Sequence, residues 1–186
     1  SKAEGERAVV EEMEKCGGRY HIVRASWLYD VVGRNFYTTM VKLGQERSEV
    51  QVVYDQRGTP TYAGSLSIAL RALVLKGGEV KSGILHYSDK GVTCWASFAR
   101  AIFDELEMDV DVLEITTEEY PTPANRPANS HLGGEHLHKL LNLEKRTWKE
   151  SLKMCVGSEL DRINRRAEVW SREPYDKETR EIGGMW

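Results

Sequence analysis

The sequence lacks the features of a membrane, secreted or nucleic-acid-binding protein. No apolar run in its 186 residues approaches the roughly 20 that a membrane helix needs, and the start has no apolar signal segment. The formal net charge of -3 provides no basic excess for wrapping nucleic acid. Cys16, Cys94 and Cys155 are far apart and form no C-x-x-C motif. We therefore expect neither a disulfide framework nor a structural zinc site, and a cytoplasmic protein fits this pattern.

A glycine-rich phosphate loop is also missing. Neither G-x-G-x-x-G nor the P-loop lysine pattern follows any expected strand, and Gly183-Gly184 lies too near the end to count. The chain therefore has no visible dinucleotide-binding turn of its own. Because it begins with Ser1 and not with methionine, we expect it to start inside a longer gene product.

What is present is an alternation of helix and strand patterns. The periodicity predicts helices over 1–17, 36–47, 62–76, 95–107, 135–141 and 147–170, and strands over 20–29, 50–54, 83–88 and 110–115. Helices that alternate with short apolar strands are typical of an α/β fold with parallel strands. From Ser171 onward the sequence is charged and nearly free of aliphatic residues, which predicts a frayed tail.

Some single residues have a simple structural interpretation. Thr93 is expected to cap the helix that starts at Trp95. His136 and His138 are two residues apart on a short helix, so they do not share a face and we expect surface histidines, not a metal pair. Trp95 and Trp148 lie near helix starts and are expected to anchor the core.

Residues 120–130 cannot form a helix or a central strand. Pro121, Pro123 and Pro127 remove three backbone donors and favour extended geometry at the preceding residues. Arg126 is the only charged residue of this segment, which we call the proline loop (residues 120–130). Its guanidinium could grip a phosphate or carboxylate through a bidentate fork, or the segment could be a stiff connector with an ordinary surface arginine.

Four stretches, in this order and spacing, resemble one known family. They are 24–29 with Asn35-Phe36, 55–61, 83–87 with the later Trp95, and the proline loop that ends at Ser130. Together they are similar to the carboxy-terminal part of the dTDP-4-dehydrorhamnose reductases, which are extended short-chain dehydrogenase/reductases. The resemblance runs from Ser1 to about Val156. Each motif is weak alone, but their combination is specific.

The resemblance implies an α/β fold: the C-terminal part of an NAD(P)-binding Rossmann-like protein with a smaller mixed α/β substrate-binding domain. Residues 1–30 would be the last helix and strand of the Rossmann-like domain. Residues 31–156 would form the sugar-nucleotide binding region. Residues 157–186 would be a polar helical extension and tail.

The start of the chain resembles the sequence at and after the catalytic lysine of the family's Tyr-x-x-x-Lys pair. Lys2 would then be that lysine, and the proton-donating tyrosine would lie before Ser1. In the family, the lysine charge lowers the tyrosine pKa and the lysine holds the nicotinamide ribose. The alternative is an ordinary frayed lysine at the chain end.

Six further residues are candidates for substrate binding, each with an alternative. Trp27 matches a family tryptophan that packs on the sugar ring, but it could be a core residue. Asn35 could hydrogen-bond sugar or phosphate, or cap the helix after it. Gln56 and Thr61 flank a Gly-Thr-Pro turn, and turn chemistry alone could explain them.

The other two candidates belong to the proline loop. Related sugar-nucleotide enzymes place an arginine followed by proline at the pyrophosphate, and Arg126 matches that pattern. Ser130 could add a hydroxyl to the ligand, or serve as a turn or cap residue.

The implied full enzyme reduces the 4-keto group of dTDP-4-dehydro-L-rhamnose with NADPH or NADH. The resemblance also allows a Mg2+ requirement and a homodimer. The 186-residue chain alone is expected to be inactive. One alternative is a regulatory subunit of the same fold that docks a partner enzyme through Trp170, Tyr175 and Trp186. Another sugar-nucleotide reductase or epimerase is a further alternative.

Overall fold

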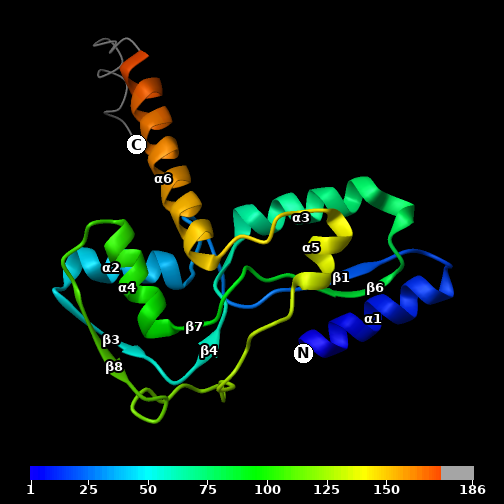
Figure 1. Cartoon of the computed structure of the whole chain (residues 1–186), viewed down its shortest axis with the longest axis horizontal. Helices are drawn as coiled ribbons and strands as arrows, with labels where there is room; N and C mark the ends of the chain where they lie inside the picture. Colours follow the sequence, from blue (N-terminus) through cyan, green and yellow to red (C-terminus); the bar gives the residue numbers. More distant parts are fainter. Residues whose placement is uncertain (173–186) are drawn as a thin grey trace, which may run out of the picture.

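The structure, a computed structural model, describes residues 1–172 as two groups of elements side by side (Figure 1). The first group consists of α1 (Lys2–Lys15), β1 (His21–Arg24), α3 (Ala63–Lys76), the 3-10 turn η1 (Gly77–Glu79), β6 (Gly83–His86) and α5 (Glu135–Leu141). The second consists of α2 (Phe36–Glu46), β3 (Glu49–Val53), α4 (Trp95–Glu105), β8 (Asp111–Ile115) and α6 (Trp148–Arg172). Between them lie the two-residue strands β2 (Leu28–Tyr29), β4 (Arg57–Gly58), β5 (Thr61–Tyr62) and β7 (Thr93–Cys94).

In the first group, β1 and β6 form a parallel pair with His21 opposite Gly83 and Arg24 opposite His86. A parallel pair requires a long crossover, and here it includes α2 and β3 of the second group as well as α3. Helices α3 and α1 lie on opposite sides of this pair (Figure 1). None of the residues of α1 is buried, and the Arg24 Nε group donates to Glu6 Oε1 at 2.8 Å. A surface ion pair of this kind adds little stability, so α1 is held only weakly by the described residues.

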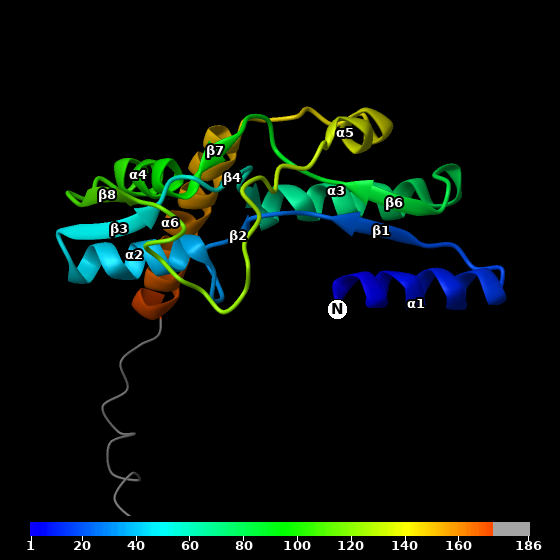
Figure 2. The same cartoon turned by 90° about the horizontal axis from the view of Figure 1, so that it is seen from below.

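The second group packs two helices on a parallel pair of five-residue strands, β3 and β8. Val50 and Val52 of β3 are buried, whereas Glu49 and Gln51 are exposed, as the alternation of side chains along a strand requires. Helix α4 contacts both strands and also packs on α2 and α6. Figure 1 shows α6 starting beside α4 and projecting away from this group, and Figure 2 shows the same arrangement from below.

The core of the second group is centred on Phe98, which is fully buried. Its ring lies 5.0 Å from the ring of Tyr29, 5.4 Å from that of Phe36 and 5.9 Å from that of Trp148. Strand β2, helix α2 and helix α6 therefore meet on one side chain of α4. A second core cluster joins α3, β6 and α5 through Leu73, Leu85 and Leu137, among others.

The structure agrees with most of the expected elements and corrects three details. The strand predicted over 20–29 is broken between β1 and β2, because Trp27 adopts a left-handed conformation with φ of 50°. The predicted cap Thr93 is wrong by one residue: Cys94 is the N-cap of α4, and its sulfur accepts from the Ser97 amide. His138 is not on the surface but is 5% exposed and stacked on Tyr87.

The expectation for Trp148 is confirmed, since it is buried in the core at the start of α6. Helix α6 continues to Arg172, two residues beyond the predicted end. The expected docking residues Tyr175 and Trp186 lie outside the described residues. Within residues 1–172, none of the helices combines the length and the apolar character that crossing a membrane requires.

We expect Phe98→Ala to lower the free energy of unfolding by about 3–5 kcal/mol, because the cavity left by the ring would lie between three elements. The measurement is urea unfolding followed by circular dichroism. Val74→Ala is the matched control, since Val74 is 77% exposed and its truncation should change stability by less than about 0.5 kcal/mol. A similar loss in both variants would contradict the central position of Phe98.

Candidate functional site

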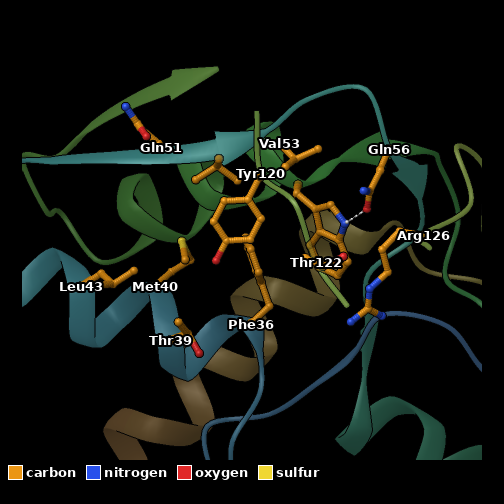
Figure 3. Close-up of a pocket in the computed structure, with 12 residues that line it drawn as sticks. Phe36, Thr39, Met40, Leu43, Gln51, Val53, Gln56, Tyr120, Thr122 and Arg126 are labelled. Carbon is orange, nitrogen blue, oxygen red and sulfur yellow. Dashed lines mark hydrogen bonds between the residues drawn. The ribbon is translucent and has the colours of Figure 1, made fainter. Parts of the chain in front are cut away.

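A cavity of about 390 Å³ opens between α2, the end of β3, the start of α4 and the proline loop (Figure 3). We call it the α2 cavity. It is lined by Phe36, Thr39, Met40, Leu43, Gln51, Val52, Val53, Gln56, Trp95, Tyr120, Thr122 and Arg126. Its volume falls within the range of small-molecule sites, and such sites combine apolar walls with a few polar groups.

The apolar part of the wall comes from α2 and β3. Phe36 and Met40 lie one turn apart on α2, and Val53 faces them from the end of β3. The Tyr120 ring, which is 57% exposed, lies between them in the close-up (Figure 3). These flat and aliphatic surfaces suit an apolar ring of a ligand.

The polar part of the wall is at the proline-loop side, where Gln56, Thr122 and Arg126 lie near one another (Figure 3). Among the described side chains, no carboxylate pairs with the Arg126 guanidinium and no acceptor hydrogen-bonds it. An arginine beside a cavity with its five donors uncommitted is suited to an anionic group of a ligand.

Two stacked indoles form the back of this polar side. The rings of Trp27 and Trp95 are 3.5 Å apart between centroids and nearly parallel, at 9°. Trp95 Nε1 donates to Gln56 Oε1 at 3.2 Å, and Trp27 Nε1 donates to Ser130 Oγ at 2.7 Å. Trp95 therefore lines the cavity with its own ring supported by Trp27 from behind.

The chain is fixed on both sides of the proline loop. On the amino-terminal side, the Thr117 hydroxyl donates to Asp55 at 2.6 Å, and Gln56 donates to the same hydroxyl at 3.1 Å. These Thr117 hydrogen bonds, from hydroxyl and amide, lower the pKa of Asp55. On the carboxy-terminal side, the Ser130 amide donates to the Arg57 carbonyl at 2.8 Å. A loop fixed at both ends presents Arg126 to the cavity with little freedom to lose on binding.

The structure brings four of the predicted site residues together. Gln56 and Arg126 line the α2 cavity, and Trp27 and Ser130 support its wall. Asn35 is committed to its helix: its Oδ1 accepts from the Thr38 amide at 3.1 Å and its Nδ2 donates to the Asp30 carbonyl at 2.8 Å. The capping interpretation of Asn35 therefore accounts for all that the structure shows of it.

The other two predicted residues do not line the α2 cavity. Thr61 is fully buried, and its hydroxyl has no hydrogen-bond partner among the described residues. Its amide donates to the Trp27 carbonyl at 3.0 Å, so its place in the structure is to hold the backbone behind the stacked indoles. Lys2 is exposed in the first turn of α1, in the other group of elements.

Sequence reasoning missed the residues that give the cavity its aromatic character. Periodicity accounts for Phe36 as part of a helix stripe, for Trp95 as a core residue and for Tyr120 as part of a stiff loop. Trp95 is only half-buried, because one of its faces is the cavity wall. The available signal was an aromatic residue directly before the first proline of the loop, as in Tyr120-Pro121.

Within residues 1–172, no group of three or more His, Cys, Asp or Glu side chains could hold a metal ion. The possible Mg2+ requirement therefore stays a prediction from the resemblance.

Comparison with known proteins gives the family. Residues 1–160 match the family model described as RmlD substrate binding domain. The chain belongs to this family. A dTDP-4-dehydrorhamnose reductase from Sinorhizobium fredii is 37% identical over 164 residues, which cover 84% of this chain and 54% of that protein.

Solved structures of such reductases have the same fold as this chain. The enzyme from Bacillus anthracis, in complex with NADP, superposes with a TM-score of 0.70 at 36% identity, covering 80% of this chain and 51% of the other. The enzyme from Clostridium acetobutylicum gives 0.69 at 38% identity, with coverage of 81% and 52%. The predicted fold class, the carboxy-terminal part of an extended short-chain dehydrogenase/reductase, is thus confirmed. The chain spans about half the length of these relatives.

We expect Gly58→Ala to disturb the wall of the site. A Cβ at Gly58 would lie 2.5 Å from the Trp27 ring and 2.8 Å from Ser130 Oγ, so the stacked indoles or the loop end must shift. The expected result is a loss of about 1–3 kcal/mol in the free energy of unfolding, with a change in tryptophan fluorescence.

The matched control is Gly5→Ala, because a Cβ at Gly5 in α1 meets nothing within 4 Å. This variant should be neutral or more stable by up to about 1 kcal/mol, since alanine favours the helix. A Gly58→Ala protein as stable as the parent, with unchanged fluorescence, would refute the close packing of Trp27 and Ser130.

Proposed function

We propose that this chain is the substrate-binding part of an NADPH-dependent dTDP-4-dehydrorhamnose reductase. Such an enzyme reduces the 4-keto group of dTDP-4-dehydro-L-rhamnose to give dTDP-L-rhamnose. The observation that carries the proposal is the α2 cavity, where an uncommitted arginine stands beside an aromatic wall. The family and the reductases similar to this chain support the same reaction.

Arg126 binds the diphosphate in this proposal. A guanidinium can donate two parallel hydrogen bonds to phosphate oxygens and offset part of their negative charge. The neighbouring Thr122 and Gln56 offer further polar groups on the same side. The charge of the ligand would therefore be recognised at the proline loop.

The apolar end of the α2 cavity takes the thymine base. Phe36, Met40 and Val53 offer the flat and aliphatic contacts that a base requires, and Gln51 and Thr39 offer hydrogen-bonding groups at its edge. The diphosphate extends out of the cavity and binds at Arg126. The sugar beyond it lies on the side of Trp27 and Ser130. Holding the nucleotide in this way positions the keto carbon for reduction, which is a large part of such catalysis.

The redox part of the reaction is assigned to the half of the enzyme that the 186 residues do not span. We assign residues 1–30 to the end of the Rossmann-like domain and residues 31–156 to the substrate-binding region, with residues 157–186 as an extension. Lys2 is exposed at the start of α1, and within the described part of the chain no carboxylate is paired with it. It is thus free to hold the ribose of NADP(H) and, through its charge, to lower the pKa of the proton-donating tyrosine. When bound, the cofactor supplies the hydride.

The proposal predicts binding without turnover for the 186-residue chain. Adding dTDP at about 1 mM should raise the melting temperature by about 1–4 °C, because a ligand that binds only the folded state stabilises it. The same chain with dTDP-4-dehydro-L-rhamnose and NADPH should not oxidise the cofactor. Stabilisation by a partner enzyme but not by dTDP would instead favour the regulatory subunit. Turnover by the chain alone would contradict the assignment of the redox machinery to the other half of the enzyme.

The role of Arg126 is tested by Arg126→Ala and Arg126→Lys. We expect the alanine variant to bind dTDP about 10–100 times more weakly, and the lysine variant to recover only part of the affinity because the fork is lost. Titration calorimetry measures both. Arg71→Ala is the control, since Arg71 is exposed on α3 and remote from the cavity. If all three variants bound dTDP like the parent chain, the assignment of the diphosphate to Arg126 would be wrong.

A further inference from the structure

A second cavity, of about 150 Å³, lies in the first group of elements, away from the proposed nucleotide site. We call it the α5 cavity. It is lined by Ser65 and Ile68 of α3, Tyr87 and Asp89 after β6, His138 of α5, and Leu143, Glu144 and Arg146 before α6. None of these residues lines the α2 cavity.

The walls of the α5 cavity carry buried polar atoms that have no hydrogen-bond partner within the described chain. They are Ser65 Oγ, Asp89 Oδ2 and both ring nitrogens of His138. The exposed fractions of these residues are 7%, 1% and 5%. Buried polar groups are nearly always hydrogen-bonded, because an unpaired one costs about 1–3 kcal/mol. Four such atoms around one cavity therefore point to an occupant that hydrogen-bonds with them.

The chemistry of the wall selects the kind of occupant. An ionised Asp89, a neutral imidazole and a hydroxyl all offer acceptors, and the Tyr87 hydroxyl only weakly occupies the other Asp89 oxygen, at 3.5 Å. Of the two neighbouring cationic side chains, Lys145 is committed to Glu135 at 2.6 Å, and Arg146 lines the cavity itself. Within the described residues no set of three metal-binding side chains is present, so a metal ion does not fit.

We propose that the α5 cavity binds a small ammonium-type cation, either ammonium itself or a primary amine of one to three carbons. Its N–H groups donate to Asp89, Ser65 and His138, and a short alkyl group contacts Ile68 and Leu143. The size fits, since 150 Å³ corresponds to roughly five water molecules by volume. The cation offsets the buried negative charge of Asp89.

The protonation of the wall agrees with this assignment. Burial raises the pKa of Asp89 to about 6, and the neighbouring polar groups of Ser151, Tyr62 and Tyr87, with the charge of Lys145, only partly oppose this. Burial also lowers the pKa of His138, so its imidazole stays neutral and keeps an acceptor nitrogen. Glu144 and Arg146 are the other charged residues of the wall.

Cation binding in the α5 cavity depends on pH through the charge of Asp89. A bound cation favours ionised Asp89, whereas protonation below about pH 6 removes the charge that attracts it. Binding should therefore strengthen as the pH rises from about 5 to about 7.5. Without the cation, Asp89 has the opposite effect on the free energy of unfolding. Because its pKa is raised in the folded state, the folded state holds the proton more tightly than the unfolded state, so the free energy of unfolding falls as the pH rises from about 5 to about 7.5.

The test is a thermal shift of the full 186-residue chain with methylammonium chloride at about 100 mM, against equal concentrations of sodium chloride and tetramethylammonium chloride. Tetramethylammonium carries the charge but no N–H group. We expect methylammonium to raise the melting temperature by about 2–5 °C near pH 7.5 and by clearly less near pH 5, and the other two salts to have no such effect. Comparing ammonium with methyl-, ethyl- and propylammonium then identifies which of them the cavity prefers.

Substitutions of lining residues test whether the melting-temperature shift with methylammonium arises in the α5 cavity. Asp89→Asn should abolish the shift, whereas Asp109→Asn, an exposed site outside the cavity, should leave it unchanged. Ser65→Ala removes one acceptor and should reduce the shift. This variant tests the proposal if the Asp89→Asn protein does not fold. No methylammonium shift, an equal shift with tetramethylammonium, or an undiminished shift in both cavity variants would overturn the proposal. None of these results bears on dTDP binding at Arg126.

Discussion

The stacking of Trp27 on Trp95 is the contact on which the proposed site depends. The two residues come from the turn before β2 and the start of α4, and their rings lie 3.5 Å apart. Trp27 reaches this position through a left-handed backbone, which costs a residue with a bulky side chain about 1–2 kcal/mol. The stack and the indole hydrogen bonds to Ser130 and Gln56 offset that cost, at roughly 1 kcal/mol each.

The stack also explains why a proline-rich segment can serve as a binding wall. Ser130 is held by Trp27, and Gln56, held by Trp95, in turn donates to Thr117 just before the loop. Prolines restrict the backbone between these two fixed points, so little conformational entropy remains to be lost on binding. Arg126 is thereby presented beside an aromatic surface instead of extending into solvent on a mobile loop.

The helices and the overall α/β class could be predicted from the sequence because they depend on local periodicity. The Asn35 cap and the break at the proline loop are local as well, and both agree with the structure. The break at Trp27, the cavity and the burial of His138 depend on contacts between residues far apart in the chain, such as Trp27 with Ser130 and His138 with Tyr87. Local periodicity carries no information on those pairs, so it cannot reveal that Trp95 lines a cavity or that His138 is buried.

The most direct measurement is a crystal structure of this chain with dTDP bound. The account predicts the thymine in the α2 cavity against its wall of Phe36, Met40 and Tyr120, with the Arg126 guanidinium donating to the diphosphate in front of the stacked indoles. A diphosphate bound elsewhere, with Arg126 directed into solvent and the cavity empty of the base, would contradict it.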